Sequence, residues 1–140
     1  MNRLPLSTVK KSGGENPVYL TVHKNGKWLI NGNYTEGSVS VYPISEGGKI
    51  EPHVQNFQFS EGSVDVKRQN RAHIHSTVFS PNYDYLFLPD LGADKIRAYQ
   101  FKNENAQPLQ EAKTAFTKNN LRKRTETFYV SSKWKICLLY

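Results

Sequence analysis

Val22-His-Lys-Asn-Gly-Lys-Trp-Leu-Ile-Asn-Gly-Asn33 and, further along the chain, Phe79-Ser-Pro-Asn-Tyr-Asp-Tyr-Leu-Phe-Leu-Pro-Asp90 are two copies of one pattern. The two copies align without a gap over residues 22–44 and 79–101. In each copy a polar turn precedes a hydrophobic run, and a second polar turn precedes a strand of alternating residues. A repeat of this length predicts a modular β architecture.

Each repeat unit is a small antiparallel sheet of three or four strands, which cannot bury both of its faces alone. It therefore needs neighbours of its own kind, and a β-propeller supplies them. The predicted all-β fold has repeats at residues 17–59 and 72–117. The predicted strands cover residues 18–22, 28–33, 38–44, 50–59, 73–80, 85–89, 95–101 and 109–117.

The length of the chain conflicts with a complete propeller. A propeller closes with about 4–8 four-stranded blades. The chain has 140 residues, and at about 40–50 residues per blade it has room for fewer than three. We therefore expect two to three blades of an incomplete ring over residues 1–118.

Composition excludes several classes of protein. The net charge is +7, but residues 1–118 carry 14 basic against 11 acidic side chains, and residues 119–140 carry 5 against 1. Scattered charge of this kind argues against nucleic-acid binding. The N-terminus lacks the apolar core of a signal peptide and no run is long enough to span a membrane, so a cytoplasmic location is expected. The single cysteine, Cys137, excludes an internal disulfide framework.

Three motifs in order carry a resemblance to a known family. They are Asn33-Tyr-Thr-Glu-Gly-Ser-Val-Ser-Val-Tyr-Pro-Ile, Arg68-Gln-Asn-Arg-Ala-His-Ile-His and Asp90-Leu-Gly-Ala-Asp-Lys-Ile. Together they resemble the lactonase family of seven-bladed β-propellers, which includes propeller-type 6-phosphogluconolactonases and carboxy-muconate lactonizing enzymes. The resemblance implies hydrolysis of 6-phosphogluconolactone or a related sugar lactone in carbohydrate metabolism. No cofactor is expected, and the sequence leaves open whether a metal is needed.

Residues 119–140 break the repeat and are expected to be an aberrant tail. Family members continue with a segment similar to Gly-Pro-Arg-His-Phe, which the printed frame lacks. Suitably chosen codons for residues 124–139, read one base later, spell this segment and its continuation. We therefore expect a frameshift between about Lys118 and Arg124, which sequencing of the gene would test.

The candidate catalytic residues are Arg68, His73 and His75. Residues i and i+2 of a strand point to the same face, so the two imidazoles would lie side by side. Imidazole transfers protons near neutral pH, and a guanidinium can hold a carboxylate or phosphate by two hydrogen bonds. The alternative is that one histidine only bonds to neighbouring backbone. A metal site at His73 and His75 is disfavoured because no carboxylate and histidine set completes it.

Gln69, Asn33 and Asp90 are the candidate substrate-binding residues. Asn33 and Asp90 occupy equivalent places in the two repeats, each at the end of a hydrophobic strand. The alternative, which the pattern favours for both, is a structural role, because short Asn and Asp side chains bond to backbone N–H groups at turns.

Three functional hypotheses remain open at this point. The first is part of a sugar lactone hydrolase that binds a small anionic lactone, and the second is a non-catalytic propeller that binds a ligand or a protein. The third is an inactive fragment, whose open blade edges and apolar faces would promote self-association.

Overall fold

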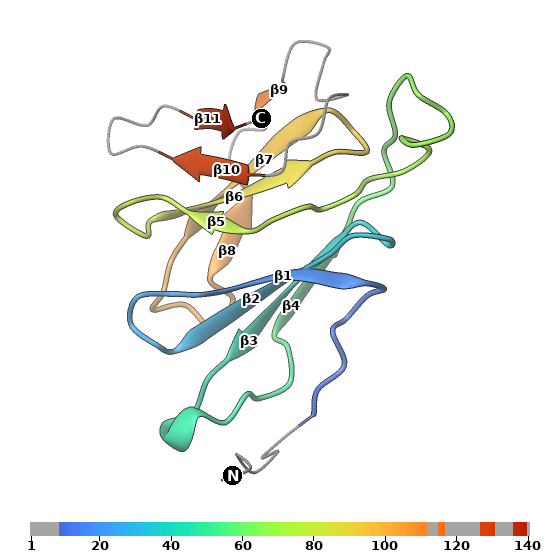
Figure 1. Cartoon of the computed structure of the whole chain (residues 1–140). Helices are drawn as coiled ribbons and strands as arrows, with labels where there is room; N and C mark the ends of the chain where they lie inside the picture. The colour runs from blue at the N-terminus through green and yellow to red at the C-terminus, as the bar shows by residue number, and fades with distance from the viewer. Residues whose placement is uncertain (1–8, 112–114, 117–126, 131–135, 140) are drawn as a thin grey trace, which may run out of the picture.

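A computed structural model describes residues 9–111, 115–116, 127–130 and 136–139, the last three as strand backbone. Two antiparallel sheets dominate the fold (Figure 1). The first has the order β1-β2-β3-β4, with β1 (Pro17–Val22), β2 (Trp28–Asn33), β3 (Ser38–Pro43) and β4 (Gln55–Gln58). The second has the order β5-β6-β7-β8, with β5 (Val78–Phe79), β6 (Tyr85–Asp90), β7 (Lys95–Phe101) and β8 (Leu109–Glu111), and β9 (Ala115–Phe116) also pairs with β7.

The sequence repeat is also a repeat of structure. β6 covers the same positions of the second copy that β2 covers in the first, and β7 begins at the position equivalent to the start of β3. The registers repeat as well, because Asn33 pairs with Ser38 in the first sheet and Asp90 pairs with Lys95 in the second. The all-β prediction is therefore confirmed, with two consecutive sheets built to one plan.

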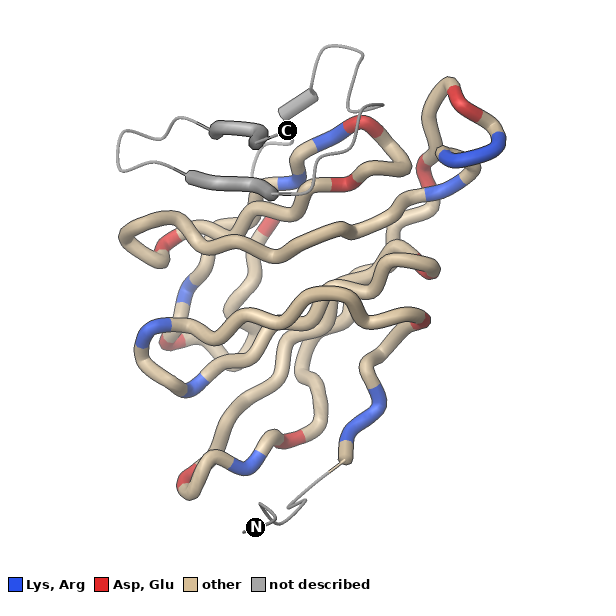
Figure 2. The backbone as a smooth tube through the Cα atoms, viewed as in Figure 1, with Lys and Arg blue, Asp and Glu red and all other residues tan. Residues whose placement is uncertain are grey.

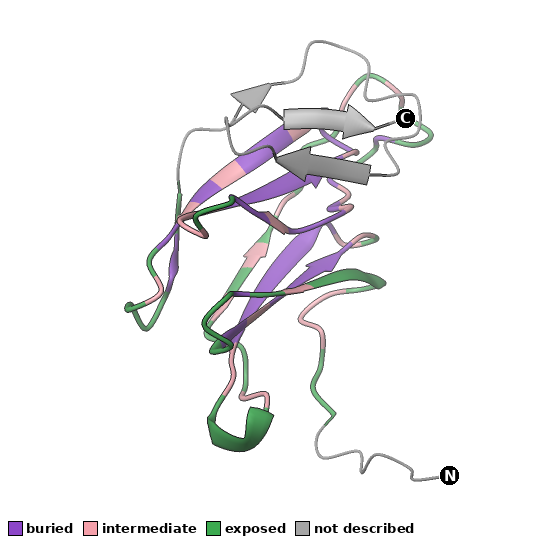
Figure 3. Ribbon diagram, turned by 60° about the vertical axis from the view of Figure 1, so that its left-hand side comes forward, coloured by how far each residue is buried: buried purple, intermediate pink, exposed green. Residues whose placement is uncertain are grey.

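The main hydrophobic core lies between the two sheets. In Figure 3 the buried segments run along β2, β3, β6 and β7, whereas β1 is largely exposed. Both sheets contribute large apolar side chains, and burial of each stabilises the packing by about 1.5–3 kcal/mol. The buried members of this cluster are Trp28, Ile30, Val39, Val41, Ile74, Phe79, Leu86, Leu88, Tyr99, Phe101 and Leu109.

Some predicted strands are shorter in the structure. The strand predicted at residues 50–59 is limited to β4, and before it lies the 3-10 helix η1 (Glu46–Gly48). The strand predicted at residues 73–80 is limited to β5, with one isolated bridge between Ile74 and Asp90. Residues 73–75 still run beside the end of β6, because the His75 N–H donates to the Pro89 carbonyl at 3.0 Å.

The first sheet has one open side. Val18, Tyr19, Leu20 and Val22 of β1 are 42–62% exposed, which is high for apolar strand residues. The self-association expected from such a face stays a prediction.

Among the described residues, no helix has the length and hydropathy of a membrane span.

The predicted aberrant tail, residues 119–140, lies mostly outside the described residues. Within it, the backbone of β10 (Thr127–Val130) pairs antiparallel with that of β11 (Ile136–Leu139). The frameshift stays a prediction.

Candidate active site

Three connecting segments meet at one end of the two sheets, at the right of Figure 1. They are the turn between β2 and β3 (residues 34–37), the long connection between the sheets (residues 59–77) and the turn between β6 and β7 (residues 91–94). Loops held by rigid strands at one edge are where binding and catalytic residues concentrate. The predicted site residues belong to these segments or to the strand ends beside them.

Two glycines bring the turns against the long connection. A Cβ atom on Gly37 would overlap the Ala72 carbonyl oxygen, and one on Gly92 would overlap the Arg71 carbonyl oxygen. Gly37 also has a φ of 65°, which a side chain rarely adopts. One turn from each sheet therefore packs closely against the backbone of residues 71–72, which directly precede the two histidines in the sequence.

From residue 71 to residue 76 the chain alternates between exposed and buried side chains. Ala72, Ile74 and Ser76 are buried, whereas His73 and His75 are partly exposed. The prediction that the two imidazoles lie on one face, with Ile74 on the other, agrees with this alternation. Arg71 is exposed and lies in phase with the histidines.

His73 is held by both sheets. Its ring stacks on the Tyr34 ring with centroids 4.6 Å apart, and its Nδ1 lies 2.9 Å from the Tyr34 carbonyl oxygen. Its backbone N–H donates to Asp90 Oδ1 at 2.9 Å. Because a carbonyl oxygen only accepts, the Nδ1 atom donates in this contact, so that in the neutral ring the lone pair is on Nε2. The His75 ring meets the Tyr34 ring edge-on at 6.1 Å.

Asp90 anchors a buried ion network directly behind His73. Its Oδ2 accepts from Arg97 Nε at 3.0 Å and from Nη2 at 2.8 Å, and its Oδ1 also accepts from the Ala93 N–H at 3.1 Å. Arg97 Nη2 also donates to Glu61 Oε2 at 2.8 Å. Burial alone would lower the pKa of Arg97, but its bonds to Glu61 and Asp90 outweigh burial and raise it. This network ties the long connection to the second sheet.

Acidification is expected to weaken this network through Glu61. The hydrogen bond from Arg97 is the main cause that lowers the pKa of Glu61 from 4.5 to about 2. A lowered folded-state pKa stabilises the fold above the unfolded value, and this contribution is lost as the pH falls from about 4.5 to about 2. Since the Glu61 side chain is 48% exposed, we expect only about 1 kcal/mol.

Urea denaturation of the wild type and Glu61→Gln at pH 7 and at pH 2 measures this difference. The variant should be less stable at pH 7, and the gap should close at low pH. Glu46→Gln, an exposed glutamate of η1 at the other end of the first sheet, is the matched control. A gap that stays constant with pH would contradict the assignment.

Gln69 and Asn33 are buried, and their side-chain amides donate hydrogen bonds to other protein atoms. Gln69 is 4% exposed, and its Nε2 donates to Asp94 Oδ1 at 2.8 Å and to the Leu91 carbonyl at 2.9 Å. Asn33 is fully buried, and its Nδ2 donates to Ser38 Oγ at 2.9 Å and to the Ser12 carbonyl at 3.1 Å. These contacts favour the structural alternative for Asn33 and Asp90. They favour a structural role for Gln69 as well.

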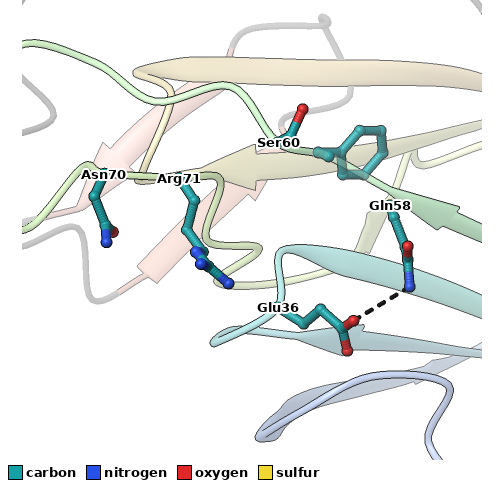
Figure 4. Close-up of a pocket in the computed structure, with 6 residues that line it drawn as sticks. Glu36, Gln58, Ser60, Asn70 and Arg71 are labelled. Atoms are coloured by element: carbon teal, nitrogen blue, oxygen red, sulfur yellow. Dashed lines mark hydrogen bonds between the residues drawn. The ribbon is translucent and has the colours of Figure 1, made fainter.

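A cleft of about 520 Å³ opens at this edge between the first sheet and the long connection. Residues from the turn after β2, the end of β4 and the long connection line it (Figure 4). Arg68 is exposed but does not line the cleft, whereas Arg71 does. The cleft is lined by Glu36, Gln58, Phe59, Ser60, Asn70 and Arg71.

Sequence reasoning did not select Tyr34, Glu36 or Arg71. Arg71 carries a usable signal, because it precedes His73 by two residues and so shares its face. Tyr34 and Glu36 carry no such signal, since they reach the site only through the packing of one repeat against the next.

Charged side chains of both signs are mixed over the described chain. Lys and Arg alternate with Asp and Glu along it, without a basic stripe (Figure 2). Within the described part of the chain, no group of three or more His, Cys, Asp or Glu side chains is placed to hold a metal ion.

Comparisons with known proteins agree on one family. A family model described as "Lactonase, 7-bladed beta-propeller" matches residues 2–131. The 6-phosphogluconolactonase of Formosa agariphila is 36% identical over 134 residues, which cover 94% of this chain and 38% of the relative. The 6-phosphogluconolactonase of Bacillus subtilis is 30% identical over 90 residues, which cover 64% of this chain and 26% of the relative.

Solved structures show the same likeness. A protein of Bacteroides fragilis superposes with a TM-score of 0.71 at 31% identity, over 77% of this chain and 32% of that one. A periplasmic gluconolactonase of Pseudomonas aeruginosa superposes with a TM-score of 0.62 at 41% identity, over 67% of this chain and 27% of that one. The chain thus spans about a third of the length of such proteins.

Proposed function

Because the chain belongs to the lactonase family of seven-bladed β-propellers, we propose that it forms part of a sugar lactone hydrolase. The proposed reaction opens 6-phosphogluconolactone, or a related sugar lactone, to the acid. Two relatives named 6-phosphogluconolactonase support this substrate. The proposal concerns the complete propeller, of which this chain supplies two consecutive sheets.

The observation that carries the proposal is the setting of His73. Its Nδ1 faces a carbonyl oxygen at 2.9 Å, which leaves Nε2 as a base. In the proposed reaction, Nε2 takes a proton from water as the water oxygen bonds to the lactone carbonyl carbon. The imidazolium then returns the proton to the ring oxygen as the ring C–O bond breaks, which restores the neutral histidine.

The other candidate residues take proposed roles beside this base. His75, on the same face as His73, would stabilise negative charge on the carbonyl oxygen. An arginine would hold the anionic group of the substrate, the role that the sequence assigns to Arg68. Gln69, Asn33 and Asp90 would position the site without touching substrate, because further blades can only add to their burial.

A hybrid propeller tests the reaction. Residues 17–111 would replace the matching segment of the Formosa agariphila relative, and hydrolysis of 6-phosphogluconolactone would be followed by acid release. We expect turnover well above the spontaneous rate. A folded hybrid without turnover would refute the proposed role and leave the second hypothesis, a propeller that binds without catalysis.

The cytoplasmic location stays a prediction, which cell fractionation would check.

A further inference from the structure

The cleft between the first sheet and the long connection contains an arginine whose charge no described residue pairs with. Arg97 is paired with Asp90 and Glu61, and Lys95 with Glu61. The Arg71 side chain, by contrast, has no hydrogen bond or ion pair with any residue that the structure describes. An unpaired guanidinium in a cleft is suited to bind an anion, because its N–H groups can donate two parallel hydrogen bonds to carboxylate or phosphate oxygens.

We infer that Arg71, and not Arg68, holds the anionic group of the ligand, and that this group is the phosphate of a phosphorylated sugar acid or lactone. This inference rests on the proposed function for the kind of ligand. Arg71 lines the cleft and lies two residues before His73, which places their Cα atoms about 6.5 Å apart along an extended chain. Arg68 lies outside the cleft, in a turn where its backbone N–H donates to the Asp65 carbonyl at 3.1 Å.

The remaining lining residues suit the hydroxyl groups of a sugar. Glu36 Oε1 accepts from Gln58 Nε2 at 3.3 Å, which leaves Oε2 without a partner among the described residues. In Figure 4 the Arg71 side chain extends from its segment toward the turn that carries Glu36. A carboxylate that accepts from hydroxyls, an amide and one cation form a set for a polyhydroxylated anion. The volume of about 520 Å³ is typical of small-molecule sites.

Binding to the 140-residue chain tests the inference without requiring catalysis. The probes are 6-phosphogluconate and gluconate, which differ only in the phosphate, and calorimetric titration gives their dissociation constants. Arg71→Gln should weaken 6-phosphogluconate binding about 10–100-fold, the effect of losing hydrogen bonds to a charged group. Gluconate binding should change less than about twofold in the same variant.

Arg68→Gln tests the rival assignment, and Lys67→Gln is the matched control, because Lys67 is also an exposed cation of the long connection and does not line the cleft. Both variants should leave both dissociation constants within about twofold of the wild type. A loss in Arg68→Gln instead, a loss in neither arginine variant, or equal binding of the two probes would overturn the inference. Absence of turnover in the hybrid with phosphate-dependent binding retained would refute hydrolysis and leave the Arg71 assignment standing.

Discussion

His73→Ala in the hybrid propeller is expected to lower kcat for 6-phosphogluconolactone hydrolysis about 10²–10⁴-fold, the usual contribution of a positioned general base. The Tyr34 carbonyl holds Nδ1 and the Asp90 carboxylate holds the backbone N–H, so the ring is oriented from both sheets. Alanine removes the proposed base but leaves the anchored backbone in place. The expected result is a large fall in kcat and a small change in KM.

His53→Ala is the matched control for this loss. His53 is exposed and contacts the Tyr42 ring edge-on in the connection between β3 and β4, away from the candidate active site. The control should retain full turnover. His73→Gln keeps a polar group of similar size but not the base, and should be about as slow as alanine. Wild-type turnover in both His73 variants, with unchanged thermal unfolding, would exclude proton transfer by this residue.

Asp90→Ala is expected to cause the largest loss of stability, about 3–5 kcal/mol, because it leaves a buried cation without its buried partner. Arg97 is only 6% exposed, and Asp90 supplies both of its buried hydrogen bonds. The substitution also removes the acceptor for the His73 and Ala93 N–H groups. Urea denaturation of the 140-residue chain, followed by circular dichroism, measures the change.

A double-mutant cycle separates the charge pair from the backbone bonds. Asp90→Asn keeps an acceptor near Oδ1 but removes the charge, and should be intermediate in stability. Each Asp90 substitution should also be combined with Arg97→Gln. The double variant should recover part of the stability lost in the Asp90 single variant, because no unpaired charge then stays buried. Additive losses in the double variant would show that the two side chains are not coupled.

Much of the fold could be predicted from pattern. The constant offset between the two sequence copies located β6 and β7 from β2 and β3, because alternation and turn residues repeat locally. Strand ends beside the long connection were less predictable. Residues 73–75 alternate like a strand, but only one bridge to β6 forms there, because the partner strand ends at Asp90.

The candidate site was only partly predictable. His73 and His75 share a face because period-two alternation is a local property. The pattern favoured a structural role for Asn33 and Asp90. The side-chain partners of Gln69, Asn33 and Asp90 could not be predicted, because Asp94, Ser12 and Arg97 lie 7 to 25 residues away along the chain. Burial, which decides whether an amide can meet a ligand, comes from those partners.

The all-β repeat, the family and the shared face of the two histidines can all be predicted from sequence alone, because each depends on residues close together in the chain. The folded structure was needed to see which arginine lines the cleft, which nitrogen of His73 faces a carbonyl oxygen, and which polar side chains are hydrogen-bonded inside the protein. These outcomes depend on contacts between the two sheets. Tyr34 and His73 are 39 residues apart, and they meet only because one repeat packs on the next.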